Sequence, residues 1–600
     1  MSDFTAPLRD MQFVIEELVG LDETAALSGG EEVTTDLVRQ ILNEAGRFGA
    51  DVLRPLNRVG DLEGSRLENG VVSTPTGFAD AYKAFVDAGW NSVAHDPDYG
   101  GMGLPTLVAT ATAEIWAAAN FGFSLCPVLT HAGVELLSRY GSEEQKDTYL
   151  PNLISGVWPG AMVMTESHAG TDIGELRTRA VPDGDHYRLF GQKIFISWGD
   201  HDMADNIIHM VLARAEGSPP GVKGLSMFIV PKFLVKPDGS LGQRNDMRAV
   251  NLEHKLGIHA SPTAIMSYGD NDGAIGYLIG EENRGIEYMF SMMNSARLAI
   301  GLEGVGIAEC AYQQAREYAM TRLQGRDVAR SDADMAPIIR HPDVRRMLLS
   351  MKSQIEATRA LSYIVAAWLD IARRHSDEET RRDHQAKVDF LIPVVKAWSS
   401  DIGFDAASTG VQIHGGAGFI EETGAAQHMR DARINMIYEG TNGIQAMDLV
   451  ARKLIGDDGA VAGLLIDEMR EFGKSLDGNE NEDIAVIHEA LADGVEALEQ
   501  ATAWLLACND SADNPTMARL SGATAYLDLV GTVIGGYLMA RSALLAARGL
   551  EAANGSEEFY SGKITTARFY AEQILSQSQG FMRATTTGSA SIMALTEAQF

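Results

Sequence analysis

Residues 436–445 of this 600-residue chain read Met436-Ile437-Tyr438-Glu439-Gly440-Thr441-Asn442-Gly443-Ile444-Gln445. Glu439 follows the apolar residues Met436, Ile437 and Tyr438 and precedes a glycine. Apolar residues then recur at helical spacing as far as Leu454, and Thr441 or Asn442 is a suitable N-cap for that helix. A glutamate at this place has two interpretations. It is a surface residue favoured by the helix dipole, or a general base whose pKa depends on burial and on a bound ligand.

The composition of the whole chain narrows the classes of protein to consider. It is 45% hydrophobic and 22% charged, as in ordinary globular proteins, and its length allows about four domains at roughly 150 residues each. Lys plus Arg total 49 and Asp plus Glu total 82, so the net charge is 49 − 82 = −33. This charge excludes nucleic-acid binding through a general basic field. An anionic ligand must therefore be held by local cations or helix N-termini.

The cysteine content and the apolar stretches bear on location. Cys126, Cys310 and Cys508 are odd in number and far apart, which favours a reducing compartment and no disulfide framework. No metal-binding Cys or His cluster is present in the sequence, so no metal site is predicted. The first ten residues lack a signal-peptide pattern, and no uncharged apolar stretch approaches 18 residues. We therefore expect a cytoplasmic protein without a membrane span.

Hydrophobic periodicity divides the chain into blocks. Helical spacing dominates up to residue 159, and apolar, Gly-bounded runs at 187–196, 207–214 and 225–230 predict strands. Helical spacing returns near residue 287. We predict an N-terminal extension (1–35), a helical domain (36–159), a β domain (160–288), a helical bundle (289–456) and a further helical domain (461–600). Because strands and helices do not alternate, and no Rossmann or P-loop motif occurs, the α+β class is predicted rather than a doubly wound sheet.

Four further segments each have a structural interpretation beside a functional one. Residues 164–172 are a polar loop after an apolar run, or hydrogen-bonding groups for a flat polar ring. Residues 193–199 are β-domain core and turn, or aromatic side chains that stack on such a ring. The cations of residues 322–326 complement a helix C-terminus or bind an anion. Residues 412–418 form a helix C-cap and turn, or permit close approach of a ligand, and His414 within them is expected to be structural.

Taken together and in this order, these segments resemble the acyl-CoA dehydrogenase family over about residues 40–456. The extra block 461–600 and the start at residues 6–11 resemble the long bacterial branch of that family. The resemblance implies an N-terminal helical domain, a middle β-barrel-like domain and a C-terminal four-helix bundle, to which the extra C-terminal helical domain is added.

The resemblance also implies FAD as cofactor, with part of its site supplied by a neighbouring subunit. The matching positions for the flavin ring are Met164, Thr165, Gly170, Thr171, Phe195, Ile196 and Ser197. The positions for the diphosphate–adenine portion and the phosphates are Arg322, Gln324, Gln412, Gly416 and Thr441. The positions facing acyl-CoA are Thr171, Asn294, Arg297 and Gly440, and Glu439 matches the catalytic base. Phe195 stands where many members have Trp, Thr171 where Ser is common, and Asn294 where many have Asp.

The implied reaction is α,β-dehydrogenation of an acyl-CoA thioester to the trans-2-enoyl-CoA. Glu439 would remove the α-proton while the β-hydride passes to flavin N5. The branch implies 3-(methylthio)propanoyl-CoA of dimethylsulfoniopropionate breakdown as substrate, an electron-transfer flavoprotein as acceptor, and a homodimer. A fatty acyl-CoA dehydrogenase, an acyl-CoA oxidase and a non-catalytic acyl-CoA-binding scaffold are the alternatives.

Overall fold

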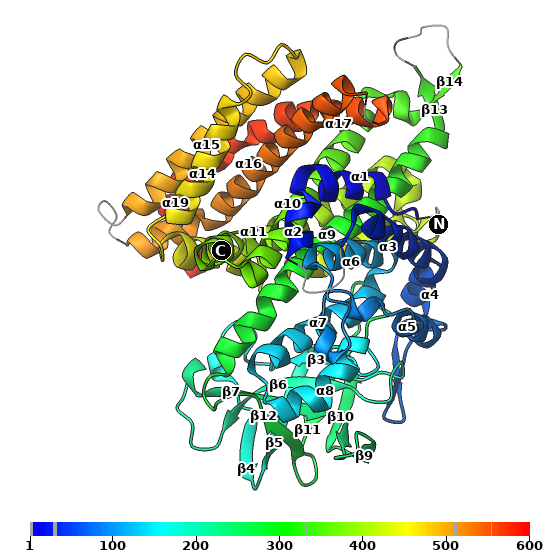
Figure 1. Ribbon diagram of the computed structural model, residues 1–600, viewed down its shortest axis with the longest axis vertical. Coiled ribbons are helices and arrows are strands. Elements are labelled where there is room, and N and C mark those ends of the chain that lie inside the picture. Colours follow the sequence, from blue (N-terminus) through cyan, green and yellow to red (C-terminus); the bar gives the residue numbers. More distant parts are fainter. Residues whose placement is uncertain are drawn as a thin grey trace. The chain divides into compact units, whose positions relative to one another are not determined.

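The computed structural model describes residues 4–27, 33–327, 329, 334–508, 514–553, 555–587 and 589–600 (Figure 1). The chain divides into two compact units. Residues 44–299 form the first, called the β unit. The described residues of 4–43 and 300–600 form the second, called the helical unit. The boundaries fall within helices α3 (Thr35–Phe48) and α9 (Gly285–Thr321).

The β unit begins with helices α4 (Arg54–Glu63), α5 (Phe78–Asp87), α6 (Thr106–Ala119), α7 (Phe121–Tyr140) and α8 (Glu143–Ser155), and with the hairpin β1 (Arg66–Glu68) and β2 (Val71–Ser73). Side chains fix the helix starts: Asn120 accepts the Phe123 N–H at 3.1 Å, and Ser142 opens a capping box. The ring of Phe85 packs edge-on against Trp116 and Phe123. These aromatic contacts hold α5, α6 and α7 together.

The sheet of the β unit has eight strands, β3 (Gly160–Val163), β4 (Arg179–Asp183), β5 (His186–Ser197), β6 (Ile208–Ala215), β7 (Leu225–Pro231), β10 (Met247–Leu252), β11 (Thr263–Tyr268) and β12 (Ala274–Leu278). Their order is β10-β11-β5-β12-β7-β6-β3, and β4 pairs with β5 and β6. Only the pairs β3–β6 and β4–β6 are parallel. A separate hairpin joins β8 (Phe233–Val235) and β9 (Leu241–Arg244).

Both faces of the central strands are buried. On β6, Met210 and Leu212 belong to a core cluster that also contains Leu136 of α7, whereas Val211 and Ala213 belong to a second cluster. Successive residues of a strand point to opposite faces, so two cores require an unbroken apolar run. This explains why Met210-Val211-Leu212-Ala213 is continuously apolar rather than alternating.

The helical unit contains the rest of α9, then α10 (Pro342–Arg374), α11 (Glu378–His414), α12 (Ala425–Ala432) and α13 (Asn442–Asp448). A hairpin of β13 (Leu323–Arg326) and β14 (Met335–Pro337) follows α9. Helices α9 and α11 meet backbone to backbone at Gly304 and Gly403. A Cβ added to Gly304 would lie 2.3 Å from the Ser399 carbonyl oxygen. Only glycine allows this approach.

The block after residue 456 forms α14 (Ala460–Lys474), α15 (Glu482–Ala507), α16 (Pro515–Glu551), α17 (Glu557–Phe569), α18 (Ser578–Thr587) and α19 (Ser589–Ile592). It packs on the bundle through α16. Added Cβ atoms at Gly531 and Gly535 would lie 2.5 and 2.7 Å from the ring of Trp398 on α11. Helices, a sheet and two further helical blocks thus follow one another, which confirms the predicted α+β class.

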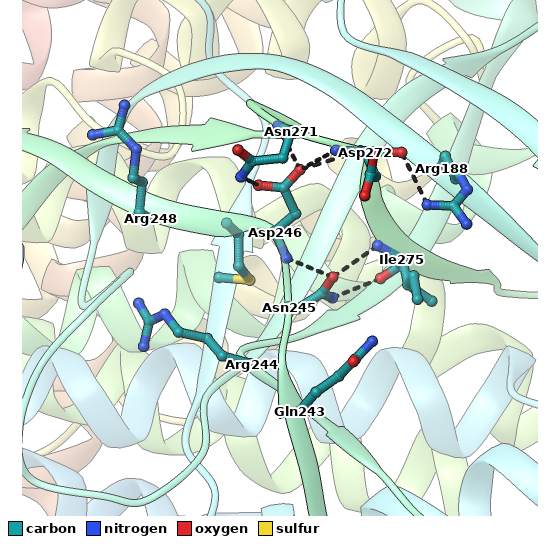
Figure 2. A pocket seen from close by; sticks show the side chains of 11 residues that line it. Arg188, Gln243, Arg244, Asn245, Asp246, Arg248, Asn271, Asp272 and Ile275 are labelled. Atoms are coloured by element: carbon teal, nitrogen blue, oxygen red, sulfur yellow. Dashed lines mark hydrogen bonds between the residues drawn. The ribbon is translucent and has the colours of Figure 1, made fainter.

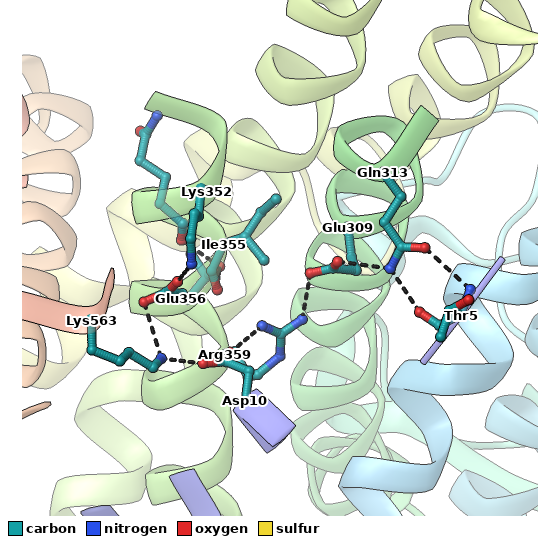
Figure 3. Close-up of polar contacts among 11 residues, drawn as sticks. Thr5, Asp10, Glu309, Gln313, Lys352, Ile355, Glu356, Arg359 and Lys563 are labelled. Atoms are coloured by element: carbon teal, nitrogen blue, oxygen red, sulfur yellow. Dashed lines mark hydrogen bonds and ion pairs between the residues drawn. The ribbon is translucent and has the colours of Figure 1, made fainter. Parts of the chain in front are cut away.

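The N-terminal segment, α1 (Leu8–Phe13), the π-helical turn Val14–Val19 and α2 (Leu21–Ala26), is tied to the helical unit by buried charges (Figure 3). Arg359, 1% exposed, binds Asp10 at 2.5 Å and Glu309 at 2.8 Å. Lys563 of α17 binds Asp10 and, at 3.0 Å, Glu356. Burial alone would raise the pKa of Asp10, but Lys563 and Arg359 outweigh it and hold that pKa well below its usual range.

Within the part of the chain that the structure describes, two helices, α7 and α16, are long and apolar enough to cross a membrane. In each helix, 78% of the most apolar 18-residue stretch is buried inside the protein. Core helices that are apolar on all sides have the same composition. Their hydropathy is therefore explained by packing within the protein.

Candidate active site

Glu439 lies in the loop between the 3-10 turn Arg433–Met436 and α13. Thr441, one of the two N-cap candidates predicted from the sequence, is the N-cap of α13, and its hydroxyl accepts the Ile444 N–H at 3.3 Å. The φ angles are 55° at Glu439 and 86° at Gly440, so both residues are left-handed. Glycine adopts this conformation freely, whereas a glutamate held in it requires contacts that fix the loop. The Glu439 side chain is half-buried, unlike that of an exposed surface residue.

Helix α11 and α13 supply those contacts. The ammonium group of Lys396, fully buried on α11, donates to the Gly440 carbonyl oxygen at 2.9 Å and to Asn442 Oδ1 at 2.8 Å. The Gln445 side-chain amide donates to the Glu439 carbonyl oxygen at 3.1 Å. Charge-assisted hydrogen bonds in a buried site are strong and directional. The backbone that carries Glu439 is therefore held in place by side chains from two helices.

A second carboxyl group, Glu303 on α9, lies beneath this loop. It is 2% exposed and accepts a hydrogen bond from the Tyr438 hydroxyl. Burial raises the pKa of Glu303 to about 8. The Tyr438 hydrogen bond and the Lys396 charge oppose this increase, while the nearby charge of Glu439 adds to it. Tyr438, the residue before Glu439, is thus hydrogen-bonded to Glu303, whose carboxyl group is neutral at pH 7.

Neither Glu303 nor Lys396 was among the site residues predicted from the sequence. Each is a single charged residue inside an otherwise apolar helical run, at residues 298–308 and 391–398. Buried charges are rare and require partners, so a charge in such a run was a usable signal. Nothing in the sequence, however, indicated which partners they have.

The residues predicted to meet the diphosphate–adenine portion lie on the surface of the helical unit. Arg322 and Gln324 follow α9 and belong to the β13 hairpin region, and Gln412 and Gly416 flank the C-terminus of α11. All four are exposed. The 412–418 segment ends α11 and continues as a 3-10 turn, which is the structural interpretation of that sequence.

His414 has a structural environment, as expected from sequence. Its Nδ1 lies 2.7 Å from the Gly410 carbonyl oxygen, and its ring stacks on Tyr318 at 4.5 Å. Burial lowers its pKa, so the imidazole is neutral at pH 7.

In the β unit, a buried ion pair joins the two segments predicted to line the flavin ring. Lys193, 0% exposed, lies 3.0 Å from Glu166 Oε1. Its ammonium group also donates to the Met164 carbonyl oxygen at 2.8 Å. The Ile194 N–H donates to the Thr165 carbonyl oxygen at 2.9 Å. Segments 164–166 and 193–194 are therefore clamped together, with the exposed Gly170 and Thr171 in the loop that follows.

Phe195 and Ile196 point in different directions because β5 carries a bulge. One extra residue stands between Lys193 and Ile196, opposite Met266 and Ala264 of β11. Phe195 has φ of 59° and is 58% exposed, whereas the Ile196 side chain, 2% exposed, lies in the sheet core. Bulges re-aim side chains in this way. An exposed aromatic ring can stack on a flat ring such as flavin, and the hydroxyl-bearing residues Thr165, Thr171 and Ser197 belong to the same two segments.

The residues predicted to meet acyl-CoA differ in exposure. Asn294 is half-buried on α9, whereas Arg297, one turn later, is only 5% exposed. Gly440 is half-buried in the base loop and Thr171 is exposed.

A pocket of about 520 Å³ opens on the β unit among Arg188, Arg244, Arg248 and the turn at 271–273 (Figure 2). Asp246 fills one side and accepts backbone N–H groups of that turn. Each arginine pairs with a carboxylate, as Arg248 does with Asp270 at 2.7 Å. None of the predicted site residues lines it. Within the described ranges, no three His, Cys, Asp or Glu side chains are placed to hold a metal ion.

Comparison with known proteins identifies the class. The chain matches the family profiles described as "Acyl-CoA dehydrogenase, N-terminal domain" (residues 35–157), "middle domain" (161–270) and "C-terminal domain" (283–455). Residues 465–596 match "Acetyl-CoA dehydrogenase C-terminal like". The chain therefore belongs to the acyl-CoA dehydrogenase family and is an acyl-CoA dehydrogenase. This confirms the predicted family, the enzyme class and FAD as its cofactor.

Individual relatives refine the comparison. The chain is 46% identical over 98% of both lengths to the 3-methylmercaptopropionyl-CoA dehydrogenase of Ruegeria pomeroyi. It is 34% identical over the full length to the broad-specificity linear acyl-CoA dehydrogenase FadE5 of Mycobacterium tuberculosis. Among solved structures, Caenorhabditis elegans ACDH-11 in complex with C11-CoA shares the fold, with a TM-score of 0.77 at 21% identity over 98% of this chain and 94% of that one.

Proposed function

We propose that this enzyme oxidises 3-(methylthio)propanoyl-CoA to 3-(methylthio)acryloyl-CoA, with Glu439 as the base that removes the α-proton. The observation that carries the catalytic part is the half-buried Glu439 in a left-handed conformation, on a loop fixed by Lys396 and Gln445. The substrate rests on the 46% identity, over nearly the whole chain, to the Ruegeria pomeroyi enzyme.

The geometry supports the following roles for the chain's own residues. The thioester α-carbon is a weak acid, so its deprotonation requires a base at a fixed distance and stabilisation of the developing charge on the carbonyl oxygen. Glu439 would take the α-proton, and its own backbone N–H would donate to that oxygen. FAD, when bound, supplies the acceptor for the β-hydride. The loop contacts keep Glu439 from relaxing to another backbone conformation during this step.

For the flavin ring we propose the hydroxyls of Thr165, Thr171 and Ser197 and the ring of Phe195. The Lys193–Glu166 pair would orient them, because it joins the two segments that carry them.

We further propose a homodimer in which Arg322, Gln324, Gln412 and Gly416 complete the partner's FAD site. The support is their exposure next to large apolar side chains: Met335 is 63% and Phe419 85% exposed. Large exposed apolar side chains are candidates for burial in an interface. Analytical ultracentrifugation tests this, and a monomer at micromolar concentration would refute it.

We propose an electron-transfer flavoprotein as acceptor and the cytoplasm as location. Hydrogen peroxide formed in proportion to turnover without an added acceptor would favour an oxidase instead.

The substrate proposal is tested by comparing 3-(methylthio)propanoyl-CoA with pentanoyl-CoA, which replaces the sulfur by a methylene group and keeps the chain length. Butanoyl-CoA and longer acyl-CoA thioesters complete the panel, with an artificial electron acceptor and kcat/KM as the readout. We expect the methylthio substrate to exceed pentanoyl-CoA. Equal or greater kcat/KM for the linear thioesters would favour a broad fatty acyl-CoA dehydrogenase, the class named for the 34% identical relative.

A further inference from the structure

The carboxyl group of Glu303 has an environment that a purely structural residue does not need. It lies on α9 in an apolar run and is 2% exposed. One oxygen, Oε2, accepts the hydrogen bond from the Tyr438 hydroxyl. The other, Oε1, is buried and accepts no hydrogen bond from any described residue. A buried carboxylate with a bare oxygen is costly, whereas a protonated carboxyl group is much less so.

Three ionisable groups act on Glu303. Tyr438 comes from the base loop, Glu439 follows it in sequence, and Lys396 comes from α11. The ammonium group of Lys396 is used elsewhere, since it donates to Gly440 and Asn442. Tyr438 is bound from a second side as well, because its hydroxyl lies 3.3 Å from Asn435 Oδ1. The hydrogen bond to Glu303 therefore anchors the residue directly before the base.

We propose that Glu303 is a positioning residue for Glu439. While Glu303 is neutral, it holds Tyr438 in place. When Glu303 ionises, its charge makes Glu439 a stronger proton acceptor. This inference rests on the proposed role of Glu439 as base. The physical reason is coupling between like charges. A negative Glu303 disfavours a negative Glu439 and so favours the state in which Glu439 has taken the α-proton.

The sign of the pH dependence follows from the burial of Glu303. Because burial raises its pKa to about 8, Glu303 is neutral at pH 7 and charged at pH 9. Proton removal from the substrate should thus become faster as the pH rises through about 8. Ionised Glu303 raises the pKa of Glu439. With a Brønsted coefficient of about one half, each unit by which the pKa of Glu439 rises increases the rate of proton removal about threefold.

The first experiment measures the protonation of Glu303 directly. Infrared spectroscopy of the FAD-loaded enzyme without substrate should show the band of a protonated carboxylic acid at pH 7 that disappears through about pH 8. Glu303→Gln should lack this band. In Glu439→Gln the band should disappear at a lower pH than in wild type, because the negative charge of Glu439 no longer raises the pKa of Glu303. In Tyr438→Phe the band should persist to a higher pH, because the hydrogen bond that lowers the pKa of Glu303 is removed. A band unchanged by Glu303→Gln would overturn the inference.

The second experiment measures flavin reduction by substrate under anaerobic stopped-flow conditions from pH 6 to pH 9.5. Wild type should show the rise near pH 8, and Glu303→Gln should not. Glu309→Gln is the matched control, because it removes another buried carboxylate from α9 and should retain the rise. A rise that persists in Glu303→Gln refutes the coupling. If Glu303→Gln does not fold, Tyr438→Phe decides, since its rise must move to higher pH.

The two proposals fail in different ways. Flavin reduction that survives in Glu439→Gln would refute the base assignment. The infrared band would still report whether Glu303 is protonated.

Discussion

Replacing Lys193 with methionine tests how the β unit fixes its predicted flavin segments. The change shortens the side chain by one atom and removes its charge. It leaves Glu166 buried without its ammonium partner, and it removes the donor of the Met164 and Leu212 carbonyl oxygens, each 2.8 Å from Nζ. Breaking a buried pair from one side costs about 3–5 kcal/mol. The three backbone and hydroxyl donors that remain on Glu166 place the expected loss near the lower end of that range.

The readout is the free energy of unfolding from urea denaturation of the FAD-free protein, with FAD affinity measured separately by titration. We expect the β-unit transition to lose about 3 kcal/mol and FAD to bind more weakly. Lys83→Met is the matched control, because it breaks an exposed pair with Asp87 in the same unit and should cost less than about 1 kcal/mol.

A second substitution separates charge from shape. Adding Glu166→Gln to Lys193→Met removes the uncompensated charge and should recover part of the lost stability. The reasoning would be wrong if Lys193→Met behaved like the exposed control, or if the double variant were less stable by the sum of the two single losses.

Three further predictions concern the helical unit. Glu439→Gln should retain the yellow bound flavin and lose activity by about 10²–10⁴-fold in kcat; near-normal turnover would contradict its role as base. Gly304→Ala should destabilise the protein by about 1–3 kcal/mol in thermal unfolding, because the new Cβ would meet the Ser399 carbonyl, whereas Gly463→Ala on α14, with no atom within 4 Å, should be neutral or stabilising. Asp10 has a lowered pKa, so the stability that its ionised form contributes is present above pH 4 and lost as the pH falls. In Asp10→Asn the free energy of unfolding should therefore decrease less steeply between pH 4 and lower pH. An unchanged decrease would argue against this role of Asp10.

Local patterns of the sequence predicted the elements that depend on neighbouring residues. The apolar runs at 187–196, 207–214 and 225–230 correspond to β5, β6 and β7. Thr441 caps α13, and the segment at 412–418 ends α11. Short or partly polar strands such as β8, β9 and β13 were missed, because a strand of three or four residues has too few positions for an alternating pattern.

The sequence by itself determined the order of the blocks, the family and Glu439 as candidate base, because these depend on residue types and their spacing along the chain. Tertiary structure decided what surrounds that carboxylate. Glu303 and Lys396 reach the base loop from helices far away in the sequence, and only the crossing of α9 and α11 at Gly304 brings them there. Likewise, the bulge in β5 depends on pairing with β11, and it exposes Phe195 while burying Ile196. Burial and hydrogen-bond partners are set by such long-range contacts, which no local spacing encodes.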